Sequence, residues 1–194
     1  MITPHLILAS QSPRRRELLS LLGLPFTTLS VGADETFDPI NSIEENVQEI
    51  AIHKAKAAKA AYRGTVPAVI IGADTIVDHG HSVLGKPSGY EDAFRMLHNL
   101  QNNTHKVHTG FSVISDSHQH CECVTTEVTF EPIDDREIRR YIEQIKPFDK
   151  AGSYGIQDPI MACYVRRIKG CYYNVVGLPV SRLYLALKSF IPGL

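Results

Sequence analysis

A short segment near the N-terminus combines hydroxyl and guanidinium groups at a spacing that suits anion binding. It contains Ser10, Ser12, Arg14 and Arg15, and Pro13 follows the second serine. Serine is a preferred N-cap and proline fits the first helical position, so we expect a helix to begin directly after Ser12. The free amides and positive dipole end of such a helix attract phosphate, and the side chains add donors. The alternative is a capped surface helix with solvated arginines.

Two carboxylates and two lysines further along the chain could bind a metal ion and more of a phosphate chain. Glu35 ends the acidic run GADE, whose simpler interpretation is a solvated turn. Asp74 follows the apolar run AVIIGA, and an aspartate at the end of a strand can bind Mg²⁺ or take a proton from water. Lys86 lies in a stiff Gly-Lys-Pro turn, and Lys54 lies on a helical stretch from which it can reach the acidic loop. Together they predict a metal and phosphate site.

Two further stretches carry chemistry-bearing side chains. The glycine-rich block DKAGSYGIQ ends at Gln157, whose amide offers both a donor and an acceptor to the edge of a base. Its alternative is a purely structural loop. The stretch HQHCEC at 118–123 invites a zinc site, but alternating residues of a hairpin point to opposite faces. We therefore expect polar surface decoration there.

The elements that must position these side chains alternate between strands and helices. Apolar runs predict strands at 5–9, 25–31, 68–73, 105–109, 111–114 and 124–130, and a closing hairpin of 163–168 with 171–176. Capping signals predict helices that begin after Ser12, at the capping boxes 42–45 and 88–91, after Asp134, and after Pro179. No linker, repeat or low-complexity segment interrupts the pattern, which predicts one α/β domain over residues 1–194.

The composition is that of an ordinary globular domain. A chain of 194 residues with 43% hydrophobic and 21% charged residues can bury a sizeable core. A formal net charge of −1 argues against a nucleic-acid binder and favours a small ligand. Because the sequence shows neither a membrane-spanning run nor a signal peptide, we expect no membrane partner and a cytoplasmic location. The four cysteines do not form a disulfide framework and are expected to be reduced.

Ordered motifs carry a resemblance to a known family. They are LASQSPRRRELL, GADET, AIHKAKAA, GADTIV, GKPSGYEDAFRML, HKVHTG, DKAGSYGIQ and YYNVVGLP. In this order they resemble the Maf family of nucleoside triphosphate pyrophosphatases across nearly the whole chain. The resemblance implies an elongated mixed β-sheet flanked by helices, similar to inosine triphosphate pyrophosphatases, with a substrate cleft between two lobes. It also implies a homodimer that hydrolyses a nucleoside triphosphate to the monophosphate and pyrophosphate.

The resemblance also assigns roles to individual residues. Asp74 matches the family's proposed proton acceptor, and Arg14, Thr75 and Gln157 match positions tied to base selection in the branch that prefers dTTP and UTP. The DKAGSYGIQ block points to that branch rather than to the sister branch that acts on 7-methyl-GTP. Asp158 departs from the family, in which glycine often follows the glutamine, and this bears on the shape of the base pocket.

The residue types and the family resemblance predict the same mechanism. The residues expected to bind the triphosphate are Ser10, Ser12, Arg14, Arg15, Lys54 and Lys86. Glu35 and Asp74 are expected to hold a divalent cation, Mg²⁺ or Mn²⁺, while water activated by Asp74 attacks the α phosphorus. A covalent route is disfavoured because no histidine base accompanies Ser12 in its motif. The alternative function is a nucleotide-binding regulator, for example of septum formation, which needs no turnover.

Overall fold

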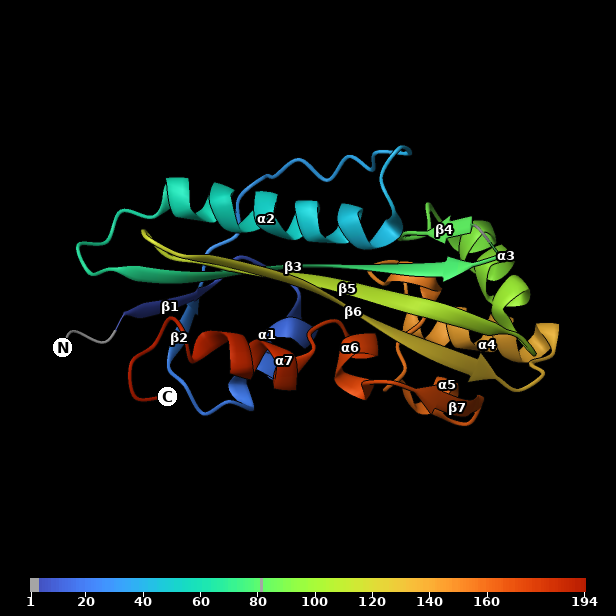
Figure 1. The fold of residues 1–194 in the computed structure, drawn as a ribbon. Helices are drawn as coiled ribbons and strands as arrows, with labels where there is room; N and C mark the ends of the chain where they lie inside the picture. The colour runs from blue at the N-terminus through green and yellow to red at the C-terminus, as the bar shows by residue number, and fades with distance from the viewer. Residues whose placement is uncertain (1–3, 81) are drawn as a thin grey trace. The chain divides into compact units, whose positions relative to one another are not determined.

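The computed structural model describes residues 4–80 and 82–194, and its central element is a mixed sheet. Its seven strands have the order β2-β1-β3-β5-β6-β7, with β4 paired to β3 (Figure 1). The strands are β1 His5–Leu8, β2 Phe26–Thr28, β3 Ala68–His79, β4 Ser82–Leu84, β5 Thr104–Ile114, β6 Gln119–Phe130 and β7 Val165–Lys169. The helices are α1 Pro13–Ser20, α2 Ile43–Ala61, α3 Tyr90–Leu100, α4 Asp135–Ile145, α5 Pro159–Ala162, α6 Tyr172–Val176 and α7 Val180–Leu187, with a 3₁₀ helix η1 at Ala151–Ser153. The predicted α/β class with a mixed sheet flanked by helices is confirmed.

The chain divides into two compact units. Unit 1 comprises Met1–Asp74, Thr109–Val124 and Gly177–Leu194, and unit 2 comprises Thr75–His108 and Thr125–Val176. The strands β3, β5 and β6 each contribute residues to both units. The single domain over residues 1–194 and the substrate cleft stay predictions.

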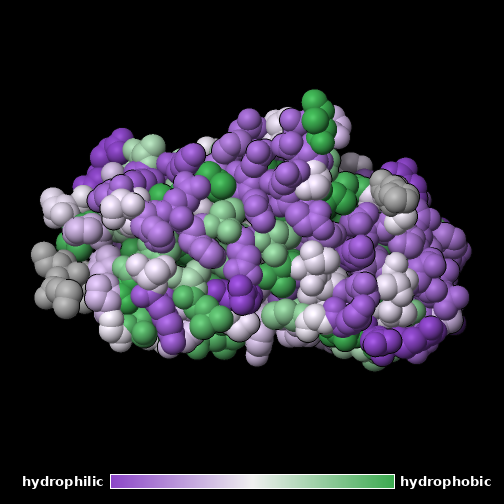
Figure 2. Space-filling view, in the orientation of Figure 1, coloured by the Kyte–Doolittle hydropathy of each residue, from purple (hydrophilic) through white to green (hydrophobic). Residues whose placement is uncertain are grey.

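In unit 1, α2 lies on one face of the sheet and α1 and α7 lie on the other (Figure 1). The strand β1 runs parallel to both of its neighbours, β2 and β3. A Cβ atom at Gly72 would collide with the backbone of Ala51, and one at Gly110 would collide with that of Val47, so only glycine allows this approach of α2. Hydrophilic side chains cover the outer surface of α2 (Figure 2). The sheet therefore fixes the position and rotation of the helix that carries Lys54.

Unit 2 has a core of its own, in which α3 contacts both α4 and η1. This core contains Phe130, Tyr141, Tyr154 and Ile156, all at least 95% buried. The side chain of His105 is buried among them, with its Nε2 atom 2.7 Å from the hydroxyl of Tyr154. Desolvation lowers the pKa of His105 to about 3, with a smaller contribution from His79, so the ring is neutral at pH 7. Because Tyr154 and Ile156 belong to the loop after η1, their burial anchors this loop in the core of unit 2.

The predicted closing hairpin is wrong in its second half. Residues 165–169 form the strand β7, but Tyr172–Val176 fold as the short helix α6. The side chain of Asn174 explains the difference, because its Nδ2 atom donates to the carbonyl of Val107 at 2.9 Å and to Thr126 Oγ1 at 3.0 Å. These two hydrogen bonds hold α6 against β5 and β6. Hydrophobic spacing alone does not report such partners.

The start of α3 also differs from the predicted capping box. Gly89 is the N-cap of this helix, and no side chain caps it. The backbone and hydroxyl of Ser88 instead donate to the carboxylate of Asp92, at 2.9 and 3.0 Å. The other predicted helix starts are confirmed, with side-chain caps at Ser12, Ser42 and Asp134. No helix in the described ranges 4–80 and 82–194 combines the length and the apolar character needed to cross a membrane.

Candidate active site

The turn between β1 and α1 has the geometry expected of an anion-binding turn. Ser12 is the N-cap of α1 and its Oγ atom accepts a hydrogen bond from the backbone of Arg15 at 3.4 Å. The Oγ atom of Ser10 accepts from the backbone of Ser12 at 3.2 Å. Pro13 is the first residue of the helix. Both hydroxyl groups therefore lie at the positive end of the helix dipole, where an anion is stabilised.

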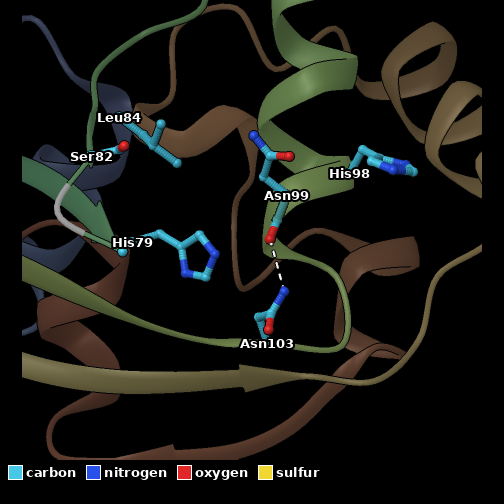
Figure 3. Close-up of a pocket in the computed structure, with 7 residues that line it drawn as sticks. His79, Ser82, Leu84, His98, Asn99 and Asn103 are labelled. Carbon is cyan, nitrogen blue, oxygen red and sulfur yellow. Dashed lines mark hydrogen bonds between the residues drawn. The ribbon is translucent and has the colours of Figure 1, made fainter.

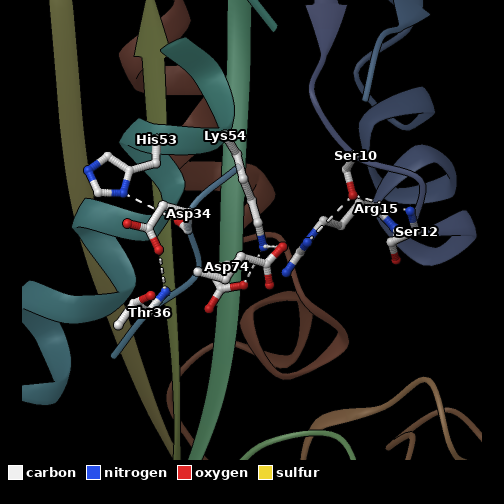
Figure 4. Close-up of polar contacts among 9 residues, drawn as sticks. Ser10, Ser12, Arg15, Asp34, Thr36, His53, Lys54 and Asp74 are labelled. Atoms are coloured by element: carbon white, nitrogen blue, oxygen red, sulfur yellow. Dashed lines mark hydrogen bonds and ion pairs between the residues drawn. The ribbon is translucent and has the colours of Figure 1, made fainter. Parts of the chain in front are cut away.

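Arg15 is a fixed cation beside this turn. Its Nε atom donates to the carbonyl of Gly177 at 2.9 Å, and its Nη1 atom lies 3.5 Å from Ser10 Oγ (Figure 4). Burial lowers the pKa of Arg15, and the nearby Asp74 carboxylate acts in the opposite direction. An arginine side chain remains charged at physiological pH even when burial lowers its pKa. Arg15 therefore offers a fixed guanidinium group to a phosphate. The contact also explains why the segment before α7 belongs to the site.

A lysine bridges the two predicted metal-binding carboxylates. The Nζ atom of Lys54 lies 2.7 Å from Asp74 Oδ1 and 3.1 Å from Glu35 Oε1 (Figure 4). The exposed fractions of the side chains are 13% for Lys54, 15% for Asp74 and 56% for Glu35. The structure thus brings together three of the residues chosen from sequence. It also places a positive charge between the two carboxylates, where the sequence analysis expected a metal ion.

The position of Asp74 in its strand differs from the prediction. The expected strand ended at Ala73, whereas β3 continues to His79 and pairs with β4 through its last residues, so the predicted strand end is wrong. The neighbouring parallel strand β1 ends earlier, with Leu8 opposite Ile71. Asp74 therefore lies beyond the carboxyl end of β1, in the middle of a longer β3. Ligands of α/β proteins bind beyond the carboxyl ends of parallel strands, and Asp74 meets this condition because its parallel neighbour β1 ends before it.

The acidic loop that carries Glu35 is tied to α2 by Asn46, which the sequence analysis did not single out. The Oδ1 atom of Asn46 accepts from the backbone of Asp38 at 2.7 Å, and its Nδ2 atom donates to the carbonyls of Asp38 and Ser42, both at 2.9 Å. Only 1% of Asn46 is exposed. An asparagine on the buried face of an amphipathic helix is the signal that could have identified this anchor.

Replacing Asn46 by Ala is expected to lower the free energy of unfolding by about 2 kcal/mol, because the buried amide and its hydrogen bonds to the backbone of Asp38 and Ser42 are lost. Chemical denaturation measures this change. Asn41→Ala is the matched control, because the Asn41 side chain is partly exposed and donates to Glu49 at 3.2 Å. That control should change stability by less than about 0.5 kcal/mol. Equal effects of the two substitutions would contradict the anchoring role.

The remaining predicted residues fall into two groups. Arg14 is half-buried in unit 1, next to Arg15 in sequence. Thr75, Lys86 and Gln157 belong to unit 2, where Thr75 is half-buried and the other two side chains are exposed. Unit 1 therefore carries the anion-binding turn and the bridged carboxylates. Unit 2 carries Thr75 and Gln157, which the family resemblance connects with base selection. It also carries Lys86, which is expected to bind phosphate.

The donor set fits a magnesium ion shared with a substrate. The described part of the chain contains no group of three or more His, Cys, Asp or Glu side chains placed to hold a metal. Mg²⁺ in nucleotide enzymes takes one or two carboxylates and completes its shell with phosphate oxygens and water. Glu35 and Asp74 supply that number of carboxylates. The pair therefore suits a cation that arrives with a phosphate chain better than a resident structural metal.

A separate cavity of about 450 Å³ lies in unit 2 (Figure 3). Its lining residues are His79, Gly80, Ser82, Leu84, His98, Asn99 and Asn103. On one wall, Asn103 Nδ2 donates to the carbonyl of Asn99 at 3.1 Å. None of these lining residues is a candidate from the sequence analysis. The cavity is therefore distinct from the proposed phosphate-binding and base-selecting residues.

The capped helix, the held arginine and the bridged carboxylates define an α/β protein with a candidate anion-binding turn beside a cluster of charged side chains. The family model described as Maf-like protein matches residues 5–190. The chain belongs to this family, as the ordered motifs in its sequence predict.

Several curated relatives match the chain almost from end to end. The dTTP/UTP pyrophosphatase of Pelodictyon phaeoclathratiforme is 56% identical over 189 residues, which cover 97% of this chain and 98% of that protein. The dTTP/UTP pyrophosphatase of Chlorobaculum tepidum is 54% identical and covers 99% of both chains. That of Bacillus velezensis is 46% identical over 97% of this chain and 98% of its own. A solved structure titled as the Staphylococcus aureus Ham1 protein is 14% identical, with a TM-score of 0.46 over 65% of this chain and 71% of that one.

Proposed function

We propose that the protein hydrolyses nucleoside triphosphates, with dTTP and UTP preferred, to the nucleoside monophosphate and pyrophosphate. The observation that carries the proposal is the Lys54 bridge between Asp74 and Glu35, beside the Arg15 guanidinium at the start of α1. The relatives named dTTP/UTP pyrophosphatase match at least 97% of the chain at up to 56% identity, and they support the choice of substrate.

In this mechanism the triphosphate is bound by hydroxyl groups, helix amides and cations. The ligands are Ser10, Ser12, Arg14, Arg15, Lys54 and Lys86. Phosphoryl transfer asks a protein mainly for positioning and charge stabilisation, which fixed cations and backbone amides provide. Glu35 and Asp74 would hold a divalent cation, Mg²⁺ or Mn²⁺, which would neutralise phosphate charge.

Asp74 is the proposed proton acceptor. Its Oδ1 atom pairs with Lys54 at 2.7 Å, which keeps the carboxylate oriented for a proton transfer from water. The oxygen of that water forms a bond to the α phosphorus as the bond from this phosphorus to the bridging oxygen breaks. The water proton passes to Asp74 and then to solvent, while pyrophosphate leaves with the electron pair. Arg14, Thr75 and Gln157 select the base.

The assembly and location follow from the same proposal. Family membership favours a homodimer, and a substrate drawn from the nucleotide pool favours a cytoplasmic location. No nucleic-acid partner is proposed, because the formal net charge of −1 provides no basic surface in excess.

The test is pyrophosphate release from a panel of dTTP, UTP, CTP, GTP and 7-methyl-GTP with Mg²⁺. Release from dTTP and UTP at the highest kcat/KM supports the proposal. A preference for 7-methyl-GTP would overturn the substrate and keep the chemistry. Binding of the same nucleotides without release of pyrophosphate from any of them would support the regulator instead.

A further inference from the structure

The residue that follows Gln157 closes a tight turn around it. The backbone of Asp158 donates to the carbonyl of Gly155 at 3.0 Å, and the backbone of Gly155 donates to Asp158 Oδ2 at 3.1 Å. A Cβ atom at Gly155 would lie 2.8 Å from both carboxylate oxygens, so this arrangement requires glycine. Ile156 is buried in the core of unit 2, whereas Gln157 is exposed. The turn is therefore anchored in the core of unit 2 by Ile156, and it exposes the side chain of Gln157.

A tyrosine on α4 locks the same carboxylate. The hydroxyl of Tyr141 donates to Asp158 Oδ2 at 2.5 Å and accepts from the backbone of Gly155 at 3.1 Å. Only 1% of Tyr141 is exposed. Burial, followed by the hydrogen bond to Asp158, raises the pKa of Tyr141, so its hydroxyl remains a donor at every physiological pH.

A lysine completes the environment of the carboxylate. The Nζ atom of Lys150 lies 3.7 Å from Asp158 Oδ2, and the two side chains are only 11% and 12% exposed. A buried carboxylate is costly unless it is paired and hydrogen-bonded. Asp158 meets that requirement through three different partners, which come from α4, from the loop before η1 and from its own turn. All three partners contact Oδ2, so the position of this oxygen is tied to α4, to the loop before η1 and to the turn at once.

We propose that Asp158 and Tyr141 are positioning residues that hold Gln157 in the orientation needed to select the base. The proposal rests on the proposed function, because it assigns a role in the discrimination among nucleotides. Neither residue needs to touch the substrate. Their hydrogen bonds fix the turn, and the turn fixes the only exposed residue between Gly155 and Asp158.

The experiment compares UTP with CTP, whose bases differ in the groups that a glutamine amide can distinguish. Tyr141→Phe and Asp158→Asn are each expected to lower the ratio of kcat/KM for UTP over CTP about tenfold, the value of one hydrogen bond. Gln157→Ala should lower the ratio by at least as much. Tyr90→Phe is the matched control, because its hydroxyl lies 3.4 Å from Glu143 in the same unit. Its ratio should stay within twofold of the native chain.

Combined variants separate positioning from general damage. In a Gln157→Ala background, Tyr141→Phe should change the ratio less than twofold, because the oriented side chain is already gone. Melting temperatures identify the variants that fold. If Asp158→Asn does not fold, Tyr141→Phe still tests the inference, because it keeps the buried ring and removes only the hydroxyl. A native ratio in the folded variants, or no effect of Gln157→Ala, would overturn the inference and leave the proposed hydrolysis standing. A native chain that releases no pyrophosphate from any nucleotide would overturn both.

Discussion

Asp74→Asn is expected to lower kcat for dTTP about 10³-fold, the effect of removing a positioned proton acceptor. The substitution keeps the size of the side chain and an oxygen that can accept from Lys54, which lies 2.7 Å from Oδ1 in the native chain. It removes the negative charge and the ability to take a proton from water. Because binding of the triphosphate relies on several other cations and amides, we expect affinity to remain within about tenfold.

Two measurements check this expectation. Pyrophosphate release under saturating dTTP gives kcat, and calorimetric titration with a nucleotide whose α–β bridge is not hydrolysable gives affinity. Asp116→Asn is the matched control, because Asp116 also pairs with a lysine of α2, with its carboxylate 3.2 Å from Lys59 and 79% exposed. The control should retain native kcat. Turnover of Asp74→Asn within threefold of the native value would remove Asp74 from the role of base.

Local signals were sufficient to predict most of the elements that surround this cluster. Ser12 and Ser42 are confirmed as caps, because an N-cap depends on residues adjacent in sequence. The predicted pairing of a lysine from the long helix with the acidic loop is also confirmed, in the bridge from Lys54 to Glu35. Helical periodicity placed Lys54 on a face from which its stem can reach this loop.

The differences arise where distant partners decide the local structure. The strand β3 extends past Asp74 because β4 pairs with its last residues, which hydrophobic patterning of the first half does not reveal. Asn174 turns a predicted strand into a helix through hydrogen bonds to residues far away in sequence. The roles of Asn46 and Asp158 were likewise hidden, because a polar residue becomes an anchor only when the fold buries it.

Contacts in the structure support the residues chosen for phosphate and proton transfer, whereas the base-selecting residues are chosen by family resemblance. Contacts in unit 1 connect Arg15 with Ser10, and Lys54 with Asp74. Gln157 is exposed in the turn that Asp158 closes, and exposure alone does not identify a base. Base selection is a difference between affinities for two ligands, so it requires measurements with both. The UTP and CTP comparison supplies them.

Lys54→Met is expected to lower kcat/KM for dTTP about 10²-fold, since it removes a cation that the proposed mechanism assigns to the reacting phosphates. It is also expected to lower the free energy of unfolding by about 3 kcal/mol, because the largely buried Asp74 carboxylate loses its ion-pair partner, while the exposed Glu35 adds little. Methionine retains the length and the apolar stem of the side chain. Lys59→Met is the matched control on the same helix, because its partner Asp116 is largely exposed. The control should cost less than about 1 kcal/mol and leave kcat/KM unchanged.

Magnesium separates the two roles of Lys54. If the ammonium group only balances Glu35 and Asp74, a divalent cation can replace it at those carboxylates, and saturating Mg²⁺ should restore both stability and turnover. If Lys54 also binds the triphosphate, Mg²⁺ should raise the melting temperature of Lys54→Met more than that of the native chain while kcat/KM stays low. We expect the second result, because a metal ion held by the carboxylates cannot supply the donors that an ammonium group directs to a phosphate oxygen. Native kcat/KM in Lys54→Met without such rescue would exclude Lys54 from the site.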